Sequence, residues 1–105
     1  MRRTVMFAVI GIWTMDESQR EQQDAGLITE VVPQVKQHPG FVSGYWMRDP
    51  ETGKAHSTIV LDSEESARSF KELVHGSRQA QARVGITNDT LALVEVTAAA
   101  QRTGP

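Results

Sequence analysis

The segment from residue 38 to residue 62 constrains the fold of this chain more than any other. It contains a chain reversal at His38-Pro39-Gly40, an apolar stretch at 41–49, the residues DPETG at 49–53 and a second apolar stretch at 55–62. Proline fixes φ in a tight turn, and glycine accepts the positive φ that such a turn often needs. The segment therefore predicts a hairpin of two antiparallel strands.

An amphipathic helix is expected before this hairpin. Asp16 or Ser18 can cap its start, and apolar residues then recur at spacings of three and four, which is one helical stripe. Pro33 lies inside the stripe and predicts a kink or an early helix end, because proline lacks the backbone N–H. The stripe consists of Leu27, Ile28, Val31, Val32 and Val35.

A second helix is expected after the hairpin. Asp62 or Ser63 can cap it, and Gly76 is expected to end or bend it. Ser77 can then cap a short piece at 78–84, followed by a loop at 87–89. The buried stripe of this helix is expected to be Ala67, Phe70, Leu73 and Val74.

The β-branched and aromatic residues at 4–13 and 91–98 predict the first and the last strand in chain order. The resulting order, βαββαβ, is the ferredoxin-like arrangement of the α+β class. It predicts a four-stranded antiparallel sheet with two helices on one face. The whole chain, 1–105, is expected to be one domain, with its core at 4–98 and a flexible tail at 99–105.

The first strand is apolar on both of its faces, yet two helices cover only one face of a sheet. Val5, Phe7, Val9 and Trp13 alternate with Met6, Ala8, Ile10 and Ile12. An apolar sheet face of this size is seldom left open to water. The pattern therefore predicts a homodimer in which two sheets pack face to face.

Composition excludes several classes of function. The 105 residues carry a net charge of −2 without runs of like charge, so a nucleic-acid or membrane partner is not expected. The absence of cysteine excludes thiolate chemistry and disulfides. The start MRRTVMFAVIGIW resembles a short signal peptide, but no cleavage site follows it, and we expect a soluble cytoplasmic protein.

The chain also resembles a known family. The residues that carry the likeness are V-x-P-x-V-x-x-x-P-G-F, V-S-G-Y-W, the D-P-E-T-G-K turn and T-I-V-L-D-S-E-E-S-A. They resemble the antibiotic biosynthesis monooxygenase-like family over residues 4–98. The resemblance implies a dimeric α/β barrel, and an activity among those of the family: cofactor-independent oxidation of quinols or polyketides, haem degradation, or none established.

The resemblance argues against the haem-degrading branch. That branch uses an asparagine on the first strand, a tryptophan at the end of the third and an axial histidine on the second helix. Here the first strand has no asparagine, Leu61 stands at the second position, and His75 matches only loosely. No cofactor and no metal site are therefore expected, and the three histidines lack metal-ligand spacing.

Seven residues are candidates for the site. Histidine titrates near neutrality and can act as a base, whereas aromatic side chains can line a pocket or simply pack in the core or an interface. Tyr45 and Trp46 are adjacent in one strand, so they point to opposite faces of the sheet. The catalytic candidates are His38, His75 and Tyr45; the substrate-pocket candidates are Trp13, Trp46, Arg48 and Phe70.

Three functions remain open from the sequence. The first is a cofactor-independent monooxygenase acting on a quinol or an aromatic polyketide-like substrate, which needs only an apolar pocket and a base. The second is a non-catalytic dimer that binds a small apolar or aromatic ligand. The third, RNA recognition on the same topology, lacks the aromatic and basic strand signature.

Overall fold

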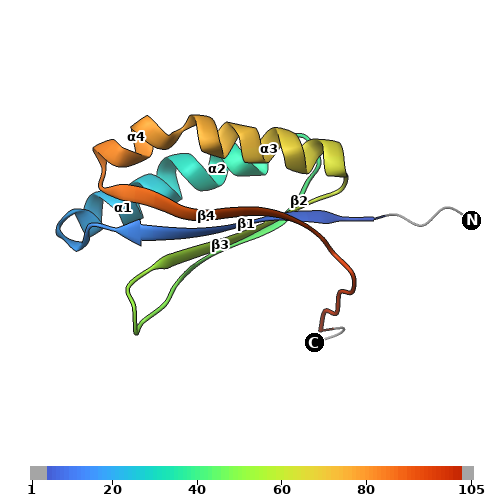
Figure 1. The fold of residues 1–105 in the computed structure, drawn as a ribbon, viewed down its shortest axis with the longest axis horizontal. Coiled ribbons are helices and arrows are strands. Elements are labelled where there is room, and N and C mark those ends of the chain that lie inside the picture. Colours follow the sequence, from blue (N-terminus) through green and yellow to red (C-terminus); the bar gives the residue numbers. More distant parts are fainter. Residues whose placement is uncertain (1–4, 103–105) are drawn as a thin grey trace, which may run out of the picture.

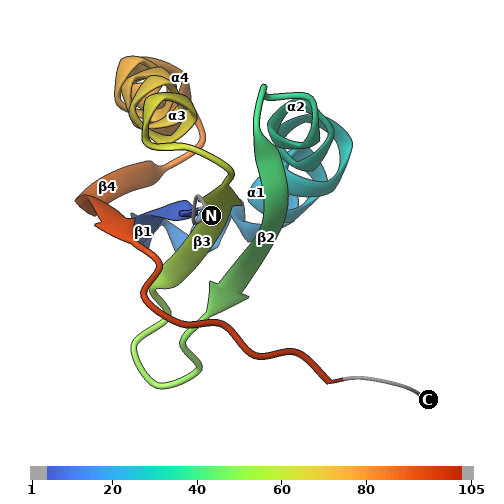
Figure 2. The same cartoon turned by 90° about the vertical axis from the view of Figure 1, so that its right-hand side faces the viewer.

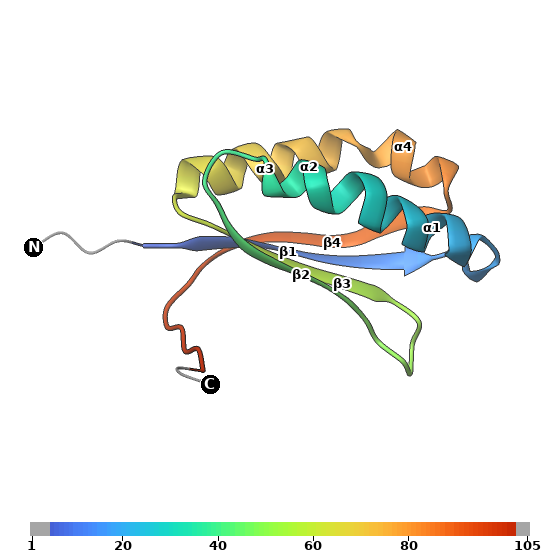
Figure 3. The same cartoon turned by 180° about the vertical axis from the view of Figure 1, so that it is seen from behind.

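The computed structural model describes residues 5–102. Strands β1 (Phe7–Met15), β2 (Phe41–Arg48), β3 (Ala55–Leu61) and β4 (Ile86–Glu95) form one antiparallel sheet in the order β2-β3-β1-β4. Helices α1 (Arg20–Gly26), α2 (Val32–Lys36), α3 (Glu64–Gly76) and α4 (Arg78–Arg83) lie on one face of it (Figures 1 and 3). The predicted ferredoxin-like fold is confirmed. Thr4, the expected start of the first strand, lies outside the described residues.

The two pairs of helices pack on different parts of the sheet. Helix α2 contacts β2, whereas α3 contacts β1, β3 and β4, and α4 contacts β4. Figure 2, turned by 90° from Figure 1, shows the two pairs standing apart above the sheet. None of the helices within residues 5–102 has the length and apolar character needed to cross a bilayer.

The first helical segment runs past Pro33 without ending early. Asp16 caps its 3₁₀ start (Glu17–Gln19) by accepting a hydrogen bond from the Ser18 N–H at 3.0 Å. A π turn at Leu27–Val31 joins α1 to α2, and the Val32 N–H donates to the Leu27 carbonyl. The expected kink thus takes the form of a widened turn placed directly before the proline.

Because of the π turn, the residues buried along this helix differ from those of the predicted stripe. Ile28 is 68% exposed and Val31 is exposed as well. The half-buried positions are Leu27, Val32 and Val35, because a π turn carries the buried line five residues forward instead of four.

The second helical segment follows the prediction with two corrections. Ser63 is the N-cap, and its Oγ accepts from the Ser66 N–H at 3.1 Å. Ser77 does not cap α4; its hydroxyl donates back to the Leu73 carbonyl at 2.9 Å. Leu73, expected in the buried stripe, is 57% exposed.

The last strand starts earlier than predicted. The expected loop at 87–89 belongs to β4, whereas residues 96–102 form no helix or strand. Gly85 turns the chain directly from α4 into the strand with a φ of +74°. Asn88 supports the register shift that follows, because its Nδ2 donates to the carbonyls of Ile12 and Thr90.

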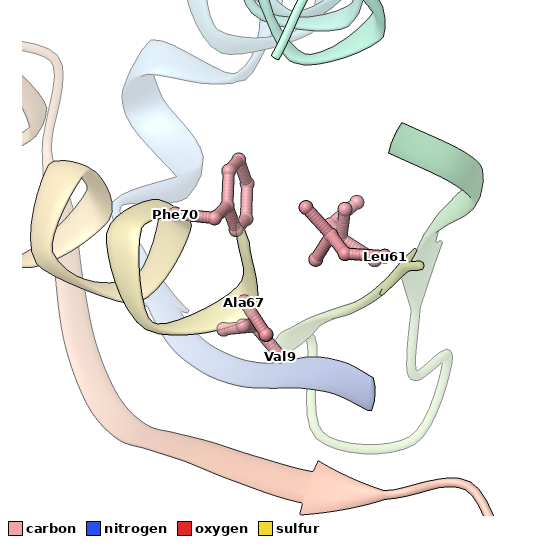
Figure 4. Packing of buried hydrophobic residues seen from close by; sticks show 5 residues of the cluster. Val9, Leu61, Ala67 and Phe70 are labelled. Carbon is pink, nitrogen blue, oxygen red and sulfur yellow. The ribbon is translucent and has the colours of Figure 1, made fainter. Parts of the chain in front are cut away.

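A second bulge changes the expected facing of β2. Strict alternation along 41–46 would place Phe41 and Trp46 on opposite faces of the sheet, but both pack against the core. The register shifts between Phe41 and Ser43, which inserts one residue and returns Phe41 to the helix side. The buried core lies between the sheet and α3 (Figure 4) and comprises Val9, Ile59, Leu61, Ala67 and Phe70.

A carboxylate on β4 connects β1 to the hairpin turn that precedes β3. Asp89 Oδ2 accepts hydrogen bonds from Thr14 Oγ1 at 2.6 Å and from Lys54 Nζ at 2.9 Å. The Thr14 hydroxyl first, and then Lys54, hold the pKa of Asp89 below its ordinary value. Because the pKa of Asp89 is lower in the folded protein than in the unfolded chain, its charged carboxylate stabilises the fold at pH values above the unfolded pKa. This stabilisation is lost as the pH falls through the pKa of the folded protein.

Replacing Asp89 should therefore flatten the acid limb of the stability profile. In Asp89→Asn, the unfolding free energy should fall less steeply than in wild type below about pH 4, where an unfolded aspartate titrates. Urea unfolding from pH 2.5 to pH 7 checks this, with the exposed Glu21→Gln as control. Parallel acid limbs for Asp89→Asn and wild type would contradict the assigned role.

Candidate functional site

The strands bring two tryptophans together on the helix-covered face. Trp46 of β2 pairs with Ser57 of β3, and Ser57 pairs with Gly11 of β1, so these residues form one cross-strand row. The next row contains Arg48, Ala55 and Trp13. The structure therefore places Trp46 beneath the helices, and Tyr45 on the opposite face.

Each tryptophan ring lies against the glycine two residues before it. A Cβ atom on Gly11 would lie 2.7 Å from Trp13 Nε1, and one on Gly44 would lie 3.2 Å from the tip of the Trp46 ring. Trp13 Nε1 also donates to Ser57 Oγ at 3.3 Å. The repeated Gly-x-Trp pattern thus lays two indole rings along the sheet. We call Gly11, Trp13, Gly44, Trp46 and Ser57 the tryptophan strip.

A side chain at Gly11 should disrupt the strip. In Gly11→Ala, the new methyl group would overlap Trp13 Nε1 and Ser57 Oγ, so the indole ring must leave its hydrogen bond. Overpacking of this kind costs about 1–3 kcal/mol of unfolding free energy. Urea unfolding and the near-ultraviolet circular dichroism of Trp13 check this.

Gly26→Ala is the matched control for that substitution. Gly26 has ordinary helical angles, and no atom within 4 Å would meet its Cβ. This variant should be neutral, or more stable by up to about 1 kcal/mol. Equal effects at Gly11 and Gly26 would show that Trp13 does not depend on the glycine.

Arg48 stands at the open end of the strip. Its Nη1 lies 3.2 Å from Glu17 Oε1, and its Nη2 lies 3.5 Å from Asp24 Oδ1, so Arg48 is paired with two carboxylates. Arg48 also lines an open depression of about 480 Å³ with Glu17, Arg20, Asp49, Pro50 and Gly53. The first ion pair connects the 3₁₀ turn to the end of β2, and the second connects α1 to it.

His38 lies at the opposite end of the helix-covered face. Its ring meets Phe70 edge-on, with ring centroids 5.3 Å apart and planes at 73°. Its Nε2 lies 3.3 Å from the Ser66 carbonyl oxygen. A carbonyl only accepts hydrogen bonds, so in the neutral ring Nε2 carries the proton and Nδ1 keeps a free lone pair.

The remaining candidates do not join the strip. Phe70 is buried in the core, although Trp46 packs against the same cluster. His75, in the last turn of α3, lines a separate open depression of about 320 Å³ with Lys71, Glu72, Gly76 and Leu91. Tyr45 is 65% exposed on the face without helices. The seven candidates are therefore spread over both faces of the sheet.

Two polar residues at the helix-covered face were missed from the sequence. Gln23 and Ser57 are both buried. Ser57 could have been found from strand parity, because it shares a face with the core residues Ile59 and Leu61. Gln23 lies four residues before Leu27 and so continues the predicted stripe, but a glutamine in a polar helical segment is usually exposed.

Within residues 5–102, no group of three or more acidic or histidine side chains could hold a metal ion. Leu61, at the position where the haem-degrading branch has tryptophan, is fully buried in the core.

The comparisons with known proteins show the fold. No family model and no curated protein matches the chain. A protein from Chloroflexus aurantiacus assigned as an antibiotic biosynthesis monooxygenase is 25% identical, with a TM-score of 0.63 over 91% of this chain and 97% of that one. The ActVA-Orf6 monooxygenase of Streptomyces coelicolor, solved with nanaomycin D, is 15% identical, with a TM-score of 0.62 over 97% and 94%.

A dimeric ferredoxin-like protein from an uncultured marine organism has the same arrangement. It is 12% identical, with a TM-score of 0.62 over 96% of this chain and 95% of that one. The predicted resemblance to antibiotic biosynthesis monooxygenase-like proteins is therefore confirmed at the level of the fold.

Proposed function

We propose that this protein is a homodimeric, cofactor-independent monooxygenase that oxidises a quinol or an aromatic polyketide-like substrate. The observation that carries the proposal is the tryptophan strip. Two indole rings lie along the helix-covered face with only glycine and serine between them. These two indoles are the side chains that we propose to receive a flat aromatic ligand, because aromatic rings stack and large apolar area is removed from water.

The face without helices supports the homodimer. Ile10, Tyr45 and Ala92 share one cross-strand row on that face. Large apolar side chains are exposed on the same face: Tyr45, Met47 and Val94. Packing two such faces together would bury these side chains. The burial would stabilise the dimer by roughly 25 cal/mol for each square ångström of apolar surface removed from water. The likeness to a dimeric ferredoxin-like protein favours the same assembly.

His38 is the base that we propose for the reaction. Its Nδ1 would take the proton of a phenolic hydroxyl, and the resulting anion is electron-rich enough to reduce O₂. The new C–O bond forms at a ring carbon, and water then leaves. A phenol and O₂ thus give a quinone and water, and every electron taken up by O₂ comes from the substrate.

Oxygen uptake with 1,8-dihydroxyanthrone tests this activity. One O₂ should be consumed for each quinone formed, above the uncatalysed rate. General-base catalysis contributes about 10²–10⁴-fold, so His38→Ala should lower the rate at least about 100-fold. If His75→Ala rather than His38→Ala loses the activity, His75 of α3 is the base. Absence of uptake with this anthrone and a panel of quinols would contradict the oxygenase.

One observation favours a second function, binding without catalysis. The five residues of the tryptophan strip carry no ionisable side chain, and the proposed base lies beyond Phe70. A protein that only binds an aromatic ligand needs nothing more. Saturable binding of the anthrone without oxygen uptake would support this alternative.

A further inference from the structure

The chain continues past β4 as a segment that leaves the sheet on the side without helices. The Val96 N–H donates to the Met6 carbonyl at 2.9 Å, so β1 still holds the chain at this residue. Residues 97–102 form no helix or strand, and every one of them is exposed. Figures 1 and 2 both show this segment on the side of the sheet opposite the helices. We call residues 97–102 the C-terminal arm.

No backbone hydrogen bond holds the C-terminal arm to its own subunit. Beyond Val96, no backbone group of the arm bonds to another backbone group among residues 5–102. The last residues of a domain keep a defined position only where they dock, and backbone amides away from water need partners. The single subunit therefore gives the arm no hydrogen-bonded support.

The composition of the arm suits a surface that a partner covers. The sequence from Val96 to Ala100 is VTAAA, which contains three consecutive alanines and no charged side chain. Burying alanine costs little side-chain entropy and removes no polar side-chain group from water. By contrast, the mostly exposed segment at 17–24 carries four charged side chains. Alanine is also the strongest helix former, yet the arm is not helical.

The arm projects past the face that we propose to receive the second subunit. Tyr45, Met47 and Val94 leave apolar surface exposed on that face. If two such faces pack together, a segment that leaves one sheet on this side runs alongside the other subunit. A twofold axis repeats every contact, so each subunit would contribute one arm and receive one.

We propose that the C-terminal arm of each subunit docks on a second copy of this chain. The inference rests on the homodimer of the proposed function, and it adds a contact outside the packed sheets. The backbone amides of the arm find acceptors on the partner, and the methyl groups of Ala98, Ala99 and Ala100 are removed from water. The affinity of the dimer therefore depends on residues that contribute nothing to the core of their own subunit.

A charge in the middle of the arm tests this contact. Ala99 is exposed in the single subunit, so Ala99→Glu should leave the fold unchanged, as circular dichroism can show. In the dimer the new carboxylate would lie in the contact, and the dimer dissociation constant should rise at least about tenfold. Sedimentation velocity over a dilution series measures this constant. Ala80→Glu, the same change at an exposed alanine of α4, should leave it unaltered.

Amide hydrogen exchange gives a second readout on the wild type. The amides of residues 98–100 should exchange at least about tenfold more slowly above the dimer dissociation constant than below it. Unprotected amides in a dimeric wild type, or an unchanged dissociation constant in Ala99→Glu, would overturn the docked arm and leave the sheet-to-sheet dimer standing. A wild type that is monomeric throughout would overturn both, whereas oxygen uptake tests the oxygenase separately.

Discussion

Ile10→Lys should convert the protein from a dimer to a monomer. Ile10 stands on central strand β1 and faces away from the helices, where the proposed partner sheet would cover it. A lysine in that position would place two unpaired charges in an apolar interface, one from each subunit. An uncompensated buried charge costs about 3–5 kcal/mol, so the dimer dissociation constant should rise at least about 100-fold.

Sedimentation velocity at micromolar concentration measures this change. Ile28→Lys is the matched control, because Ile28 is exposed on the helix side and its replacement should leave the dimer intact. Circular dichroism shows whether each variant is folded. A wild type that sediments as a monomer would remove the proposed dimer, and a dimeric, folded Ile10→Lys would remove the proposed interface.

Phe70→Ala should cost about 3–5 kcal/mol of unfolding free energy, which is a large share of the stability of a small domain. Phe70 projects from α3 into the core beside Leu61 (Figure 4) and also supports the ring of His38. Alanine would leave a cavity at the point where helix and sheet meet. The loss should therefore lower both the stability and the order of His38.

Urea unfolding gives the first quantity, and the sharpness of the His38 ring resonances gives the second. Leu73→Ala is the control on the same helix, because Leu73 is mostly exposed and its truncation removes little buried area. A loss below about 1 kcal/mol in Phe70→Ala would show that α3 is not held by this contact.

The sequence predicted the order of the elements because each one has a strong local signal. Alternation and the Asp-Pro-Glu-Thr-Gly turn defined the hairpin, and Ser63 marked the start of α3. It was harder to predict which face of the sheet each side chain of β2 occupies. Alternation separates Tyr45 from Trp46 but does not say which one meets the helices, and the bulge after Phe41 reverses the parity near the start of the strand.

The candidate site was less predictable than the fold. Trp13 and Trp46 were expected near a pocket, and the structure brings them to one face with Ser57 between them. Gln23 was not considered, because a glutamine in a polar helical segment looks solvent-exposed. Its burial depends on carbonyl groups of Asp16 and Val84, which belong to distant turns and leave no local signal in the sequence.

The π turn at Leu27–Val31 also bears on how this chain is to be aligned with its relatives. A π turn forms when a single residue is inserted into an α-helix whose two ends stay in place. Relatives with a regular helix here should therefore lack one residue, and a gap belongs within 27–31 rather than in a flanking loop. Only an alignment with that gap compares Gln23 and Val35 with their true structural counterparts.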